Sequence, residues 1–260
     1  MKFRRHAVVI YYHEWLLLTS QIKTLNFAMW RLTKKLEIRM NNFTSHYEFS
    51  APRVPVASPV DGLMPIESLD KPVMVEIVLW SAMKPGYFIQ LKLDGYLIGG
   101  CKTLTSEDKP GNVIFMELSE EYLMEERSYT LCYTATNDVN QVSEDAPVTP
   151  LLVDRTAPGG PLLAPILFHQ INFGETLTGT VPGYADMQPG DRIQTLCNDR
   201  EGPTHVVTTE NLTDRPVQII FDKAFLLDLD SDSVTVRYQV TDRAGNRSIM
   251  ARPVTLSMQS

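Results

Sequence analysis

Residues 233–248 read SVTVRYQVTDRAGNRS, and this stretch decides the fold. Four apolar residues alternate with polar ones: Val234, Val236, Tyr238 and Val240. A period of two with β-branched and aromatic residues predicts a strand with one buried face, which leaves Arg237 and Gln239 exposed. The sequence after Thr241, DRAGN, is rich in turn-forming residues. We therefore expect a hairpin whose return strand runs over residues 247–257.

The same pattern occurs earlier in the chain. Residues 128–143 read SYTLCYTATNDVNQVS and match the stretch 105 positions later. The run Met-x-Pro-Gly at 83–86 returns at 187–190, an offset of 104. Self-similarity at a fixed period indicates tandem copies of one unit, and about 100 residues is the size of one β-sandwich. In the earlier copy Tyr129, Leu131 and Tyr133 are expected to face inward, and Cys132 outward and less buried.

The domain organisation follows from this repeat. In 260 residues we expect an N-terminal segment and linker at 1–53, one domain at 54–154, a linker at 155–161 and a second domain at 162–260. Short strands separated by turn residues predict an all-β fold for both domains. The linker holds two prolines and two glycines, which exclude a helix or a central strand there.

The N-terminal segment differs in composition from the rest. Apolar residues at helical spacing favour a helix over 14–38, with disorder as the alternative. A basic amphipathic helix could bind a membrane surface if residues 1–39 are retained. The other interpretations are a helix packed on the first domain, or a segment upstream of a start at Met40. The segment lacks the uninterrupted apolar core and cleavage site of a secretory signal.

Charge and cysteine content exclude several classes of protein. The net charge is −7, whereas nucleic-acid binding requires clustered Lys and Arg, so no nucleic-acid partner is expected. The three cysteines, Cys101, Cys132 and Cys197, are an odd number and share no position between the copies. We predict free thiols rather than a disulfide framework.

One acidic run has the spacing of calcium ligands. Asp228, Asp230 and Asp232 form a DxDxD pattern. The glycine and the bidentate glutamate of a calcium loop are missing, because Ser233 and Gln239 stand in their places. A solvated acidic turn is the favoured interpretation, with these three aspartates as weak metal candidates.

No catalytic set is visible in the sequence. Of the histidines, His6, His13 and His46 precede the domains, and His169 and His205 lie in polar surroundings. There is no G-x-S-x-G motif and no glycine-rich phosphate loop, so an enzyme is disfavoured and no cofactor is predicted.

Aromatic residues of the first domain offer one alternative function. They are Trp80, Tyr87, Phe88 and Tyr96. Together they could form a platform for a carbohydrate, although strand alternation divides them between two faces. A carbohydrate- or calcium-binding accessory module is therefore the alternative to a purely structural role.

Two short motifs resemble a known family. The run TDRAGNRS at 241–248 and the segment VDRTAP at 153–158 are similar to the tandem bacterial immunoglobulin-like repeats of large surface and secreted proteins. The resemblance covers residues 54–258 and implies two tandem immunoglobulin-like sandwiches. It implies a spacing or adhesion role outside the cytoplasm and brings no catalytic residues. The implied partners are a host or cell-surface protein, a glycan, or neighbouring repeats of a longer chain. The first copy departs from the pattern at 137–141, where NDVNQ lacks the glycine and implies a different turn.

Overall fold

The structure of the chain, a computed structural model, describes residues 49–169, 175–213 and 216–258. The helix expected over 14–38 and the membrane-binding segment at 1–39 lie outside these residues. The described chain is all-β, as predicted, with several antiparallel sheets and only short helical turns. Among the helices in these three ranges, none has the length and hydrophobicity needed to cross a membrane.

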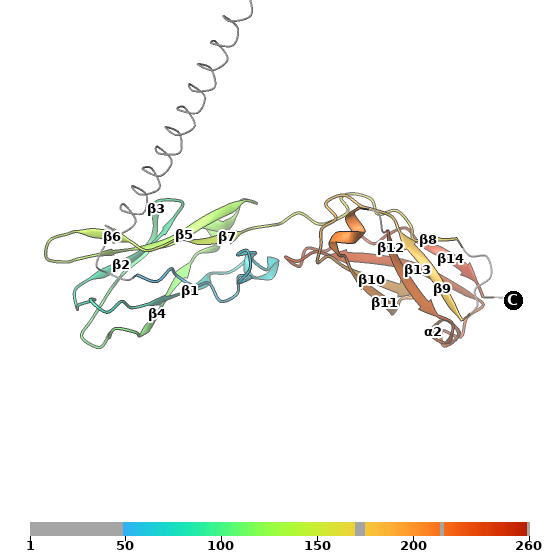
Figure 1. Ribbon diagram of the computed structural model, residues 1–260, viewed down its shortest axis with the longest axis horizontal. Helices are drawn as coiled ribbons and strands as arrows, with labels where there is room; N and C mark the ends of the chain where they lie inside the picture. Colours follow the sequence, from blue (N-terminus) through green and yellow to red (C-terminus); the bar gives the residue numbers. More distant parts are fainter. Residues whose placement is uncertain (1–48, 170–174, 214–215, 259–260) are drawn as a thin grey trace, which may run out of the picture. The chain divides into compact units, whose positions relative to one another are not determined.

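The first half of the described chain forms two sheets. Its strands are β1 (Val73–Val78), β2 (Phe88–Leu93), β3 (Tyr96–Thr103), β4 (Val113–Leu118), β5 (Ser128–Thr136), β6 (Ser143–Asp145) and β7 (Thr149–Leu152). β1 pairs with β4, and the other sheet has the order β3-β2-β5-β6 with β7 also paired to β5. Figure 1 shows these as two layers, β5 to β7 in one and β1 and β4 in the other. The 3-10 turns are η1 (Ile66–Ser68) and η2 (Glu120–Leu123).

The second half contains a corresponding set of elements. Its strands are β8 (Leu167–Phe168), β9 (Thr176–Val181), β10 (Arg192–Cys197), β11 (Arg200–Val206), β12 (Val217–Asp222), β13 (Ser233–Thr241) and β14 (Val254–Ser257). One sheet has the order β12-β9-β8 and the other β11-β10-β13-β14. The helical elements are η3 (Thr209–Leu212) and α2 (Lys223–Leu227). β8 is limited to these two residues.

The pairing register of the first half recurs in the second. The β2–β5 pair begins with Phe88 opposite Thr136, and the β10–β13 pair with Arg192 opposite Thr241, at offsets of 104 and 105. The β1–β4 and β9–β12 pairs also match, with Val78 opposite Val113 and Val181 opposite Val217, at offsets of 103 and 104. The sequence similarity at this offset therefore coincides with a repeated hydrogen-bonding pattern.

Each half has its own hydrophobic core between its two sheets. The first core runs from Val54 to Val153 and the second from Leu163 to Ala251. We call these halves the first and second sandwich. Antiparallel sheets that bury one face each produce this arrangement, because alternate side chains of every strand point into the shared interior.

The residues with the alternating apolar pattern, 233–241, form strand β13. Val234, Val236, Tyr238 and Val240 are buried, and the prediction from alternation is confirmed. Arg237 and Gln239 between them are half-buried rather than fully exposed, because Arg237 forms an ion pair with Asp199 and Gln239 Nε2 donates to the Ser248 carbonyl. In the first sandwich Tyr129, Leu131 and Tyr133 are buried as expected.

The predicted return strand over 247–257 is wrong in its extent. Only β14, residues 254–257, pairs as a strand beyond a single bridge from Thr241 to Arg247. The Ser248 hydroxyl accepts a hydrogen bond from the Val240 N–H in place of a ladder partner. Side chain–backbone bonds of this kind compete with regular pairing, so the chain follows β13 irregularly until β14 begins.

Cys132 is also an exception to its predicted exposure. Only 6% of its surface is accessible, although it lies on the outward side of β5. β6 has no equivalent strand in the second sandwich, and its Asp145 forms an ion pair of 2.5 Å with Lys92, the residue opposite Cys132. We attribute the burial of Cys132 to this additional cover.

The three cysteines are free and should differ in reactivity. Cys101 is exposed, whereas Cys132 and Cys197 are buried. Burial raises the pKa of both buried thiols, that of Cys197 to about 11, and the reactive species is the thiolate. We expect a thiol reagent at slightly alkaline pH to modify Cys101 rapidly and the other two only after denaturation. Rapid modification of two or three thiols in the folded protein would contradict this assignment.

Candidate functional site

A lateral groove opens at the edge of the first sandwich. It lies between β3 and the segment that crosses from β4 to β5, and its volume is about 390 Å³. Apolar and aromatic side chains line it: Leu93, Tyr96, Ile98, Tyr122, Met124 and Tyr129. Tyr96 is 77% exposed, whereas Tyr129 is buried at the base. The volume is within the range of small-molecule sites.

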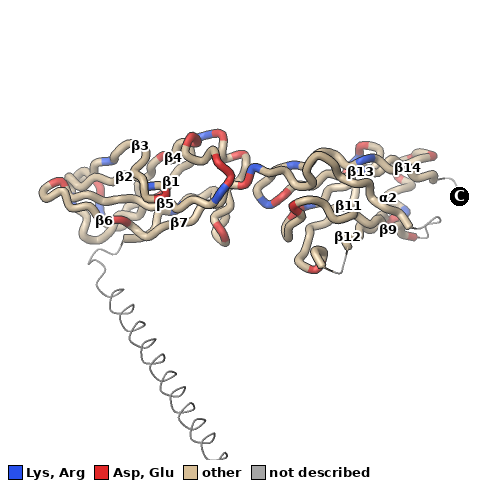
Figure 2. The backbone as a smooth tube through the Cα atoms, turned by 90° about the horizontal axis from the view of Figure 1, so that it is seen from above, with Lys and Arg blue, Asp and Glu red and all other residues tan. Residues whose placement is uncertain are grey.

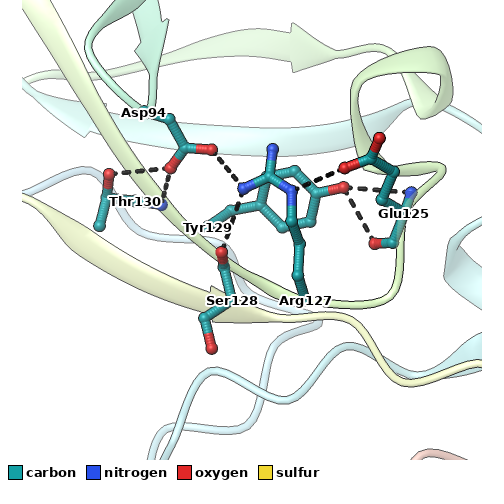
Figure 3. Close-up of polar contacts among 6 residues, drawn as sticks. All are labelled: Asp94, Glu125, Arg127, Ser128, Tyr129 and Thr130. Atoms are coloured by element: carbon teal, nitrogen blue, oxygen red, sulfur yellow. Dashed lines mark hydrogen bonds and ion pairs between the residues drawn. The ribbon is translucent and has the colours of Figure 1, made fainter.

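The polar part of the groove is organised by Arg127. Its guanidinium carbon lies 3.7 Å from the centre of the Tyr129 ring. Nη1 donates to Asp94 Oδ2 at 2.6 Å and Nε donates to Glu125 Oε2 at 3.1 Å (Figure 3). Two ion pairs and a stacked ring fix the plane of the guanidinium in advance of any ligand.

Asp94 holds this arrangement to the strands. It occupies the two-residue turn Asp94-Gly95 between β2 and β3, a dipeptide typical of tight hairpins, and β2 pairs with β3. Its Oδ1 accepts hydrogen bonds from the Thr130 N–H and hydroxyl (Figure 3). Burial alone would raise the pKa of Asp94, but the bonds from Thr130 and Arg127 outweigh it and hold the pKa below its usual value. The carboxylate therefore stays charged.

The equivalent edge of the second sandwich carries different side chains. Arg200 occupies the position of Tyr96, as the first residue of the strand after the turn. Arg200 forms an ion pair with Asp228 at 2.6 Å and lies over the Phe225 ring. A Cβ at Gly202, the counterpart of Ile98, would collide with the Thr195 hydroxyl and lie in van der Waals contact with Phe225. The two sandwiches therefore differ in the side chains at this edge.

The sequence-predicted aromatic platform is divided by the structure. Trp80 lies in the core against Phe49 and Tyr87, and Tyr87 and Phe88 are partly buried. Of the four residues only Tyr96 lines the groove. Sequence analysis missed the groove because Tyr122, Met124 and Arg127 come from an irregular segment whose position no periodicity predicts.

The weak metal candidates do not converge. Asp228 is paired with Arg200, and Asp230 and Asp232 are exposed. Within the three described ranges, no three His, Cys, Asp or Glu side chains form a group that could hold a metal ion. His205 contacts the Asn211 side chain at 3.0 Å, and His169 is exposed.

The two motifs that carry the family resemblance meet at the join between the sandwiches. Asn246 Nδ2 donates to the Asp154 carbonyl at 3.1 Å and to Asp242 Oδ2 at 2.8 Å. Arg243 in the same turn forms an ion pair with Asp61 at 2.7 Å. The turn at 242–246 therefore contacts the first sandwich at Asp61 and at Asp154, the residue just before the linker.

The linker itself is bonded at both ends. The Arg155 N–H and the Thr156 hydroxyl donate to Glu126 in the first sandwich. Gly159 is buried and donates its N–H to the Ala185 carbonyl in the second sandwich at 2.9 Å. Its φ of 85° suits glycine, and a side chain there would collide with Leu163. Gly159 therefore packs the linker against the second sandwich.

A cavity of about 380 Å³ lies at this join, and carboxylates dominate its lining. They are Glu126, Asp154, Asp186, Asp191 and Asp242. Charged residues of both signs adjoin each other in the connecting segment (Figure 2). Burial raises the pKa of Asp154, and the nearby charges of Asp242, Glu126 and Asp186 raise it further.

Asp154→Asn should slightly stabilise the protein near neutral pH. The amide oxygen can still accept from the Thr156 N–H, as Asp154 Oδ1 does at 3.0 Å, while the repulsion is removed. A carboxyl with a raised pKa favours folding at low pH, and this contribution is lost as pH rises through that pKa. We expect a gain of a few tenths of a kcal/mol in the free energy of unfolding, the size for partly exposed charges.

This gain should vanish in acid, where Asp154 is protonated. Chemical denaturation near neutral pH and in acid measures the gain in the free energy of unfolding. Asp232→Asn, at an exposed position, is the control. A gain that grows as pH falls would contradict the assigned repulsion.

Similarity to known proteins is found among solved structures. No family model matches the chain, and no curated protein matches it. Among solved structures, a chain of a 1.5-MDa bacterial ice-binding adhesin, studied for its retention at the host cell surface, is similar. The alignment has 17% identity and a TM-score of 0.43, and it covers 80% of this chain and 64% of that chain. A likeness this distant does not carry a function from one protein to the other.

Proposed function

We propose that the chain is a non-enzymatic module of a bacterial cell-surface or secreted protein. Two tandem immunoglobulin-like sandwiches would act as a spacer that places other parts of the protein at a distance. The observation that carries this proposal is the repeated register, in which β2–β5 and β10–β13 pair alike at offsets of 104 and 105. Recurrence of one unit along a chain suits a role that depends on length.

The hydrogen bonds at the join between the two sandwiches support the spacer role. A flexible connection would let the sandwiches tumble independently, which is the default for domains with a small interface. Here Thr156 is bonded to the first sandwich, Gly159 to the second, and Asn246 crosses between them. These contacts restrict rotation about the linker without a large apolar interface.

Protease treatment of intact cells that produce the protein tests this function. We expect the sandwiches to be cleaved from, or detected on, unbroken cells, or to be recovered from the medium. A cytoplasmic protein of the same cells, protected until lysis, is the control. Protection of this chain until the cells are lysed would contradict a surface or secreted location.

A further inference from the structure

We propose that the lateral groove of the first sandwich binds a neutral glycan. The inference goes beyond the proposed spacer role, which stands whether or not the groove is occupied. It rests on the exposed Tyr96 ring, on the fixed guanidinium of Arg127 and on the different side chains, Arg200 and Phe225, at the corresponding edge of the second sandwich.

The apolar wall of the groove suits the face of a sugar ring. Tyr96 projects from the start of β3 with most of its surface accessible, and Met124 is exposed on the facing segment. Aromatic rings with one polar end are favoured where a ligand is partly apolar and partly wet. The C–H face of a pyranose has this mixed character.

The polar groups of the groove can form hydrogen bonds with the hydroxyl groups of a sugar. Nη1 and Nε of Arg127 are engaged by carboxylates, whereas no hydrogen bond of Nη2 is found within the described residues (Figure 3). Glu125 accepts from Nε of Arg127, and Glu121 also lines the groove. A planar donor next to acceptors matches adjacent hydroxyls, and because Arg127 is already fixed, binding orders little additional side chain.

The groove does not suit an added peptide strand. Strand addition needs a continuous row of free backbone groups on an edge strand. β3 has a register shift around Gly99, the Gly99 N–H points to the Tyr122 hydroxyl at 3.4 Å, and Gln90 donates to the Gly99 carbonyl at 3.0 Å. The edge is thus interrupted at the groove, as in strands protected from pairing.

The charge of the groove favours a neutral ligand over an acidic one. The groove is lined by three carboxylates, of Asp94, Glu121 and Glu125, and one guanidinium, of Arg127, which is paired with Asp94 and Glu125. A sialylated or uronic acid glycan would bring another negative charge into this group. Like charges brought together at an interface oppose binding, so neutral hexose and N-acetylhexosamine units are preferred.

Glycan binding by the full chain tests the inference. The probes are an array of neutral oligosaccharides of glucose, galactose, mannose and N-acetylglucosamine, a matched set of acidic glycans, and extended peptides. Titration of the full chain with the tightest neutral oligosaccharide gives the dissociation constant. We expect neutral glycans to bind best and Tyr96→Ala to weaken binding about tenfold, since the ring contributes most of the accessible aromatic surface.

Two variants control for changes in folding. Tyr96→Phe keeps the ring, and Leu97→Ala removes a side chain that is 56% exposed on the opposite face of β3. Leu97→Ala should bind within about twofold of the unmodified chain, and Tyr96→Phe should bind more tightly than Tyr96→Ala. Failure of every neutral oligosaccharide to bind at millimolar concentration, unchanged binding by Tyr96→Ala, or a preference for acidic glycans or peptides would each overturn the inference. These outcomes leave the surface location, tested on cells, unaffected.

Discussion

Tyr238→Ala is expected to lower the free energy of unfolding of the second sandwich by about 3–5 kcal/mol, the usual cost of emptying the site of a buried aromatic ring. Tyr238 is 0% exposed and lies in the central strand β13. Its hydroxyl donates to the Ala164 carbonyl at 2.8 Å, so truncation removes a hydrogen bond as well as the ring. Chemical denaturation followed by circular dichroism measures the loss, because Trp15, Trp30 and Trp80 all lie outside the second sandwich.

Tyr238→Phe separates the two contributions. It keeps the ring and should cost only about 0.5–1.5 kcal/mol, because one hydrogen bond is lost. Tyr96→Ala, at an exposed position, should change stability by less than about 0.5 kcal/mol. A loss below about 1 kcal/mol for Tyr238→Ala would mean that the ring is not part of a packed core.

The second large effect is expected for Gly62→Ala in the first sandwich. Gly62 has a φ of 75°, and a Cβ there would collide with the Pro150 carbonyl. The backbone cannot easily move away, because the Leu152 N–H donates to the Gly62 carbonyl at 2.9 Å. The left-handed conformation costs about 1–2 kcal/mol and the collision about 1–3 kcal/mol more.

Gly111→Ala is the matched control for this substitution. Gly111 has a similar φ of 81°, but nothing lies near a Cβ built there. Only the conformational cost of about 1–2 kcal/mol should remain. Equal losses for the two variants would show that the contact between Gly62 and Pro150 does not constrain the chain. Gly62 and Tyr238 lie in different sandwiches. The losses in the free energy of unfolding caused by the two substitutions should therefore add when they are combined.

Sequence patterns predicted the parts of the fold that a single rule determines. Alternation alone determines the buried face of β13, and Asp94-Gly95 alone predicts the turn after β2. Cys132 was misjudged because its cover comes from β6, through the ion pair of Lys92 with Asp145. Alternation specifies a face of a strand, and it carries no information about what packs on that face.

The candidate site shows the same limit more strongly. Tyr96 could be selected from sequence as one of several aromatic residues, but its neighbours in the groove could not. Arg127 and Glu125 are close to each other in sequence, whereas Asp94 reaches them only through the pairing of β2 with β5. Arg127 and Asp94 are 33 residues apart, so no local sequence pattern predicts their ion pair.

Each core is built from one continuous stretch of chain, which determines the order of events during synthesis. The first core is complete once Val153 has left the ribosome, while the second still lacks all its strands. Domains of this kind fold as units, the N-terminal one first, so the nascent first sandwich can fold before its neighbour competes for its strands. The hydrogen bond from Asn246 to the Asp154 carbonyl can form only after nearly the whole chain is made. We therefore expect this contact between the sandwiches to form last.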